Sequence, residues 1–156
     1  MSDWITITED VIKTRLSGPE LAAFKSTALS EGQSADGVLA EQIVQIVDKV
    51  RGYCATAVKA GYLKKLGASG TVPSRLVNAT ANLIRYEMAT RLPGMRKLID
   101  ELRQKQQEAD IKLLESVASG RFLAEDPDTE ETAVSSPSPK IAARRKKFGR
   151  CDQDGI

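Results

Sequence analysis

The stretch that decides the fold is Val38 to Val58, VLAEQIVQIVDKVRGYCATAV, in which apolar side chains recur at steps of three and four. This spacing places them on one face of an α-helix. The positions on this apolar stripe are Leu39, Ile43, Ile46, Val47, Val50, Cys54, Ala57 and Val58. Polar residues, Gln42 among them, fill much of the remaining surface. We therefore predict a central amphipathic helix, about 30 Å long, whose stripe is covered by other segments.

Helical patterns also occupy most of the chain on either side of this stretch. Thr8 precedes two acids and predicts a helix start, and Pro19 is well placed in the first turn of a second helix. Pro73 opens a long helix that ends before Pro93-Gly94, and a last helix is predicted from Met95 to about Ser119. The fold class predicted is all-α, a small bundle of about four to five helices around the central one.

The composition changes at residue 125. Residues 1–124 form the predicted helical domain, whereas residues 125–156 contain three prolines, many Ser and Thr residues and few large apolar side chains. Such a segment cannot bury enough apolar surface to offset its ordering entropy. We expect a flexible tail, acidic at first and basic later, that a partner can order.

Several classes of function lack the residues that they need. The 156 residues include no His and only two Cys, Cys54 and Cys151, and the glycine spacings match no phosphate-binding or dinucleotide-binding loop. We predict no catalytic residue, no cofactor and no metal site, and hence no enzyme. With a net charge of +2, no signal sequence and no long apolar run, we expect a soluble protein made in the cytoplasm, without membrane contact.

Two groups of cations are candidate interaction sites. Lys64 and Lys65 lie in the glycine-rich segment Gly61 to Val72, which predicts a projecting loop; they are either solvated or in contact with an acidic partner. The second group lies in the tail and has one aromatic member. It consists of Lys140, Arg144, Arg145, Lys146, Lys147, Phe148 and Arg150. Three interpretations of this cluster are open: a solvated tail, a segment that docks on an acidic protein groove, or a segment that binds nucleic acid.

The order of these segments resembles a known family. The motifs that carry the resemblance are WITITEDVIKTRLSGPELAAF from Trp4, IVDKVRGYC from Ile46, TVPSRLVNATANLIRYEMATRL from Thr71 and LLESVASGRF from Leu113. Over about residues 4–123 the chain resembles the small helical head–tail connector proteins of tailed bacteriophages, also called adaptor or head-completion proteins, especially those of the Mu-like branch.

The resemblance implies a structural virion protein without enzymatic activity. Its copies would form a ring, commonly a dodecamer, beneath the portal protein at the neck of the virion. The ring would extend the DNA channel, help to retain the genome, touch the packaged DNA non-specifically and bind other neck or tail-completion proteins. By analogy, the tail around Arg144 to Phe148 would dock on the portal, and the loop with Lys64 and Lys65 would face the lumen or the next ring. The alternative is a small nucleic-acid-binding or packaging accessory protein that uses the basic tail.

Overall fold

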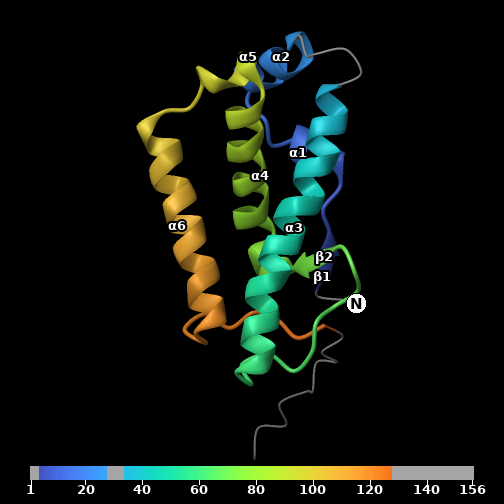
Figure 1. The fold of residues 1–156 in the computed structure, drawn as a ribbon, viewed down its shortest axis with the longest axis vertical. Coiled ribbons are helices and arrows are strands. Elements are labelled where there is room, and N and C mark those ends of the chain that lie inside the picture. The colour runs from blue at the N-terminus through green and yellow to red at the C-terminus, as the bar shows by residue number, and fades with distance from the viewer. Residues whose placement is uncertain (1–3, 28–33, 128–156) are drawn as a thin grey trace, which may run out of the picture.

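The computed structural model describes residues 4–27 and 34–127, and this part of the chain is mostly helical (Figure 1). The helices are α1 (Glu9–Lys13), α2 (Gly18–Ser26), α3 (Ala35–Lys59), α4 (Val77–Arg91), α5 (Pro93–Arg96) and α6 (Glu101–Ala118), with a 3-10 turn, η1, at Ser74–Leu76. Two three-residue strands, β1 (Trp4–Thr6) and β2 (Thr71–Pro73), pair antiparallel with Ile5 opposite Val72. The all-α prediction is confirmed, with α1 and α5 as short additions to the longer helices.

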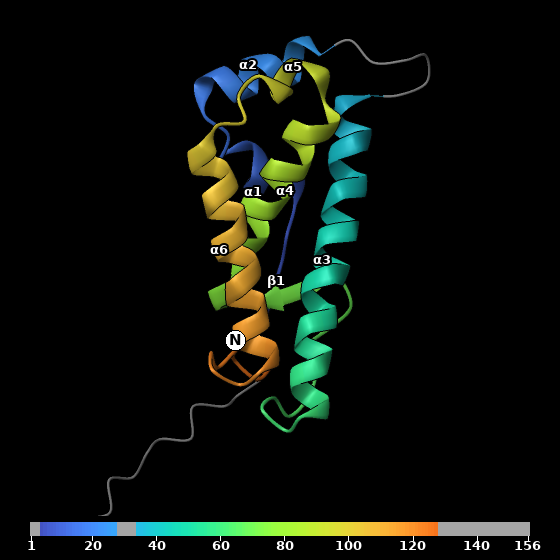
Figure 2. The same ribbon diagram turned by 60° about the vertical axis from the view of Figure 1, so that its left-hand side comes forward.

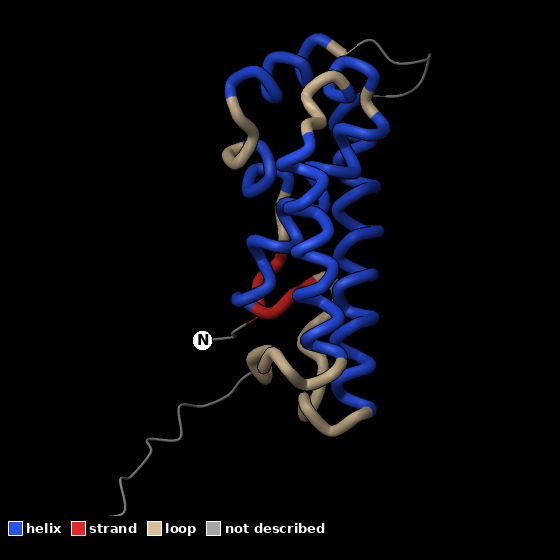
Figure 3. The backbone as a smooth tube through the Cα atoms, turned by 90° about the vertical axis from the view of Figure 1, so that its left-hand side faces the viewer, coloured by secondary structure: helices blue, strands red, loops and turns tan. Residues whose placement is uncertain are grey.

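Three long helices form the body, and short elements close its ends. The helices α3, α4 and α6 contact one another pairwise, and α4 lies between the first halves of α3 and α6 (Figures 1 and 2). The helices α2 and α5 lie together at one end of the body. Toward the other end lie the two strands, drawn red in Figure 3, close to the loops that follow α3 and α6. The fully buried centre includes Leu39, Leu76, Ile84, Met88 and Leu114.

The central helix forms as its stripe predicts, with one exception. Ser34 caps α3 by accepting from the Gly37 N–H at 3.0 Å, and Val50 and Cys54 are fully buried. Gln42, predicted to be on the polar side, is only 1% exposed. With its amide oxygen turned toward α4, Gln42 accepts from the Arg91 guanidinium at 3.0 and 3.2 Å. This polar contact explains how an amide can be buried at the α3–α4 contact.

Two predicted helix starts are wrong, and both have a local cause. Pro73 does not open α4, because residues 71–73 pair with β1 and a 3-10 turn intervenes before Val77. The last helix does not run from Met95. Asp100 has an extended backbone and accepts from the Arg103 N–H at 2.9 Å, which makes it the cap of a new helix, α6. After α6, Gly120 adopts the left-handed conformation typical of a helix end, with φ of 73°.

The remaining parts of the molecule fit a compact helical body. None of the helices within residues 4–27 and 34–127 is long and apolar enough to span a membrane. Cys54 lies in the core as predicted, and burial raises the pKa of its thiol to about 11 although Arg51 lowers it slightly. This thiol is therefore unreactive at neutral pH.

Candidate interaction surface

The loop that carries Lys64 and Lys65 is held against the body by three contacts to one guanidinium. Arg51, on α3, donates to the carbonyls of Gly67, Ala68 and Thr71 at 3.1, 2.7 and 2.8 Å. Its guanidinium also lies 5.6 Å from the centre of the Trp4 ring, a cation–π distance. Arg51 thus joins the loop, β2 and the start of the chain.

Trp4 explains why the loop needs a glycine at its closest approach. A Cβ atom on Gly67 would lie 2.5 Å from the Trp4 ring, closer than atoms can pack. Trp4 is 4% exposed, and its indole N–H donates to the Glu125 carbonyl at 2.8 Å. Trp4 is therefore a packing anchor. The loop is consequently positioned by the body, which fixes where its lysines lie.

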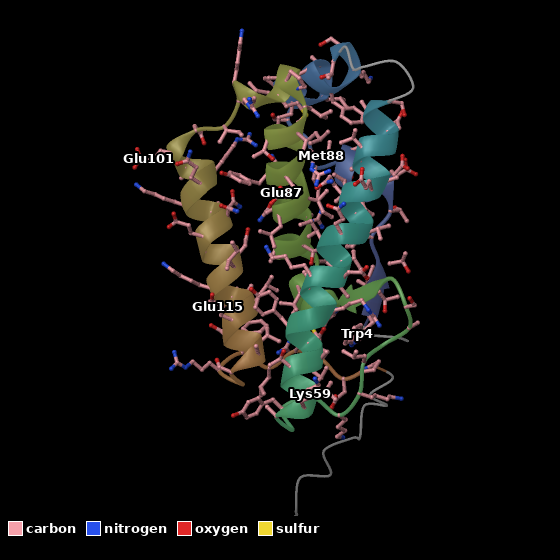
Figure 4. All side chains as sticks on the ribbon, in the orientation of Figure 1. Trp4, Lys59, Glu87, Met88, Glu101 and Glu115 are labelled. Carbon is pink, nitrogen blue, oxygen red and sulfur yellow. The ribbon has the colours of Figure 1, made fainter. Side chains whose placement is uncertain are left out.

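Lys64 and Lys65 are both exposed and share one end of the molecule with other cations. We call this surface the basic end and define it as Lys59, Lys64, Lys65 and Arg121, all exposed. These residues come from the end of α3, the loop after it and the turn after α6; Figure 4 labels Lys59 there. None of the four forms an ion pair with another described residue. Tyr62, half exposed at 50%, adds an aromatic ring to the same loop.

The first acidic residues after the helical body are packed rather than free. Glu125 accepts from the Ser74 hydroxyl and pairs with Arg75 at 2.8 Å. Asp126 accepts from the Lys64 N–H at 2.7 Å. Both residues belonged to the predicted flexible tail, and here they tie the end of the described chain to the loop and to η1. The candidate docking residues Lys140, Arg144, Arg145, Lys146, Lys147, Phe148 and Arg150 lie outside the described residues.

At the opposite end of the body, a buried carboxylate joins three helices. Glu20 of α2 is 1% exposed and accepts from the Arg85 guanidinium of α4 at 2.9 Å, from the Arg103 guanidinium of α6, and from the Ser17 N–H at 2.7 Å. Burial alone would raise the pKa of Glu20, but the hydrogen bonds from Ser17, Arg103 and Arg85 outweigh it and lower the pKa to about 2.

Sequence reasoning did not find this carboxylate, although one signal was present. Ser17 and Glu20 are spaced as in a capping box, and the structure shows both of its hydrogen bonds. The pattern predicts a buried or half-buried glutamate at a helix start, but nothing in the sequence indicates which arginines reach it.

The α4–α6 contact contains a second acid, Asp110, which is partly buried. Burial raises the pKa of Asp110, and a hydrogen bond from Asn82 opposes that rise. Asp110 Oδ2 and Arg85 Nε are buried without a hydrogen-bond partner among the described residues. A cavity of about 20 Å³ between the two helices, lined in part by Asn82 and Arg85, has room for about one water molecule. This contact is polar packing and holds no substrate-sized site.

Residues 7–143 match the family described as bacteriophage Mu, Gp36. The chain belongs to the bacteriophage Mu Gp36 family. Membership makes it a phage protein and indicates a part in phage structure or morphogenesis. Comparison with curated proteins and with solved structures gave no match.

The range matched to the Mu Gp36 family divides the candidate residues. It contains the loop with Lys64 and Lys65, the Glu20 contacts and Lys140, whereas Arg144 to Arg150 follow its last residue. Within residues 4–27 and 34–127, no three His, Cys, Asp or Glu side chains are grouped so that they could hold a metal ion.

Proposed function

We propose that this protein is a head–tail connector whose copies form a ring beneath the portal, extend the DNA channel and join the head to the neck or tail. Membership of the Mu Gp36 family is the observation that carries the proposal. A structural role also accords with a small helical body whose loop after α3 is held in place by Arg51. In this proposal the protein is not an enzyme, and its site is the neck of the virion.

The basic end suits a surface that faces DNA. Its four cations are exposed and unpaired within the described chain, and Arg51 fixes the loop that carries two of them. Exposed Lys and Arg side chains bind phosphates without reading sequence, which suits a channel through which any part of a genome passes. In a ring, each copy would present the same four cations to the lumen, so that a weak contact per copy is repeated around the DNA.

The other partners that we propose are the portal and a further neck or tail-completion protein. Because Glu125 and Asp126 are packed on the body, the chain beyond Pro127 begins beside the basic end. We assign portal docking to the segment with Lys140, Arg144 to Lys147, Phe148 and Arg150, whose cations and single aromatic ring fit an acidic groove.

The connector role is tested by electron microscopy of particles made while this gene is silenced in its phage. We expect heads that have lost their DNA, lying apart from full-length tails, because the neck is incomplete. Restoring the gene from a plasmid should restore joined virions. Joined, DNA-filled virions in the silenced culture would contradict the connector role and favour a packaging accessory protein.

Portal docking is tested separately with a chain that lacks residues 128–156, which leaves the contacts of Glu125 and Asp126 intact. We expect the deletion to lower affinity for purified portal at least tenfold, measured by biolayer interferometry, while the circular dichroism spectrum keeps its helical minima. A full-length chain with Arg144, Arg145, Lys146 and Lys147 replaced by Gln should show most of the same loss. Unchanged portal affinity in both variants would contradict the assignment of docking to this segment.

A further inference from the structure

A groove runs between the first half of α3, the start of the chain and the loop before β2. Its volume is about 410 Å³, and its apolar wall includes Ile7, Ile43, Val44 and Val47. Val44 is 61% exposed although it is apolar. A groove of this size has room for a leucine side chain together with part of the helix that bears it.

One acid at the edge of this groove has no counter-ion. Asp48, one turn after Val44 on α3, lines the groove, is exposed and forms no ion pair with a described residue. The groove would therefore be complemented by a helix that carries an apolar side chain and, about one helical turn away, a cation.

The first half of α6 has that pattern. Leu102 is 73% exposed, the most exposed of the large apolar side chains in the described chain, and Lys105 follows it by three positions on the same side of the helix. Ala109, also exposed, continues this stripe one turn later. Lys105 pairs with Glu101 at 2.7 Å, but both side chains are largely exposed. Replacing Glu101 by another acid as the partner of Lys105 therefore costs little free energy.

We propose that the first half of α6 of one copy docks in the α3 groove of the next, with Leu102 against Val44 and Lys105 beside Asp48. This inference rests on the ring of the proposed function. In Figures 1 and 2 the first halves of α3 and α6 lie on opposite sides of α4, and Figure 4 shows Glu101 at the outer edge of α6. One copy therefore carries both complementary surfaces, facing different neighbours, which is the arrangement that a head-to-tail ring requires.

The contact is small, which decides where it must be tested. One leucine, one alanine and one ion pair bury far less surface than a stable protein dimer needs. We therefore expect the contact to form in the assembled particle, where the portal holds neighbouring copies together, and not between free copies in dilute solution.

The first test is disulfide formation in purified particles of a phage that carries Val44→Cys and Leu102→Cys, with Cys151→Ser to remove the tail thiol. Cys54 is fully buried and its pKa is about 11, so it does not interfere. After mild oxidation we expect dimers, trimers and higher multiples on a non-reducing gel, all collapsing to monomer under reduction. A matched control, Val44→Cys with Lys25→Cys on the exposed surface of α2, should stay monomeric.

Each other outcome has a defined meaning. Protein that is present in the particles yet monomeric on the gel would overturn this contact and leave the connector role standing. Dimers from Val44→Cys or Leu102→Cys alone would indicate a symmetric contact and overturn the head-to-tail arrangement. A link between Val44→Cys and a retained Cys151 would show that the tail occupies the groove, and would also overturn the proposal. Purified particles without the protein would overturn the connector role, and the inference with it.

A second test does not depend on cysteine chemistry. Asp48→Lys and Lys105→Asp should each lower phage titre at least tenfold, because each places like charges at the contact, and the double variant should recover most of the titre. Both positions are exposed, so little loss of folding stability is expected. Failure of the double variant to recover would overturn the pairing of Lys105 with Asp48.

Discussion

Replacing Glu20 by Gln is expected to lower the free energy of unfolding at pH 7 by about 3 kcal/mol. The substitution keeps the volume of the side chain but removes the charge that Arg85 and Arg103 share, and it replaces one of the two acceptor oxygens by an NH2 donor that faces a guanidinium at a largely buried site. Breaking a buried ion pair on one side costs about 3–5 kcal/mol, and the 21% and 27% exposure of the two arginine side chains places this case at the lower end. Urea denaturation followed by circular dichroism measures the change.

The same carboxylate predicts how stability depends on pH. Its pKa is lowered from 4.5 to about 2 in the folded protein, so the charged form is favoured by folding. The stabilisation is fully present above pH 4.5 and is lost as the pH falls toward 2, with a total of about 3 kcal/mol at about 1.36 kcal/mol per pKa unit. Glu20→Gln should remove most of this acid-sensitive part, so that the two proteins converge in stability near pH 2.

A suitable control for Glu20 is Glu101→Gln. Glu101 also belongs to an ion pair with a neighbouring cation, but its side chain is 79% exposed, and the change should stay within about 0.5 kcal/mol of the parent. Equal effects of the two substitutions would contradict the role of Glu20 as the buried junction of α2, α4 and α6.

Replacing Arg51 by Ala is expected to lower the free energy of unfolding by about 2–3 kcal/mol and to release the loop that carries Lys64 and Lys65. Three backbone carbonyls lose a charged donor, and the Trp4 ring loses its cation. Lysine should not rescue the loss, because an ammonium group cannot reproduce a planar guanidinium that reaches three carbonyls. Hydrogen exchange of the Thr71 amide, which donates to the Ala68 carbonyl, would report the loosening directly.

The control for Arg51 lies two residues away on the same helix. Lys49 is exposed and forms no ion pair with a described residue, so Lys49→Ala should change stability by less than about 0.5 kcal/mol. If Arg51→Ala left both the stability and the exchange of Thr71 unchanged, the loop would have to be held by other contacts. The proposed contact of the basic end with DNA would then not depend on a fixed loop.

The elements that followed from sequence are those governed by local pattern. The stripe of α3 predicts a helix because apolar spacing alone determines which face is buried, and Leu39, Val50 and Cys54 are fully buried as expected. The starts of α4 and α6 were wrong for a different reason. Pro73 would fit the first turn of a helix as well as a strand. Its pairing with Trp4 of β1, at the start of the described chain, decides its conformation.

Contacts between distant residues account for what the sequence could not indicate about the candidate sites. Glu20 and Arg103 are 83 positions apart, and no local pattern connects them. The loop lysines were identified correctly as exposed, because glycine-rich composition favours a surface loop. The contacts that hold the loop could not be predicted, because in the sequence Arg51 is not distinguishable from the other polar residues on the polar side of α3.

The hydrogen bond from Trp4 to the Glu125 carbonyl spans 121 positions and fixes the root of the C-terminal segment. The two ends of the described chain are therefore joined to each other. A pull on the chain after Glu125 would be taken up by Trp4, and through Trp4 by β1 and by the guanidinium of Arg51. A load applied at the last described residues is in this way carried by the first strand of the fold.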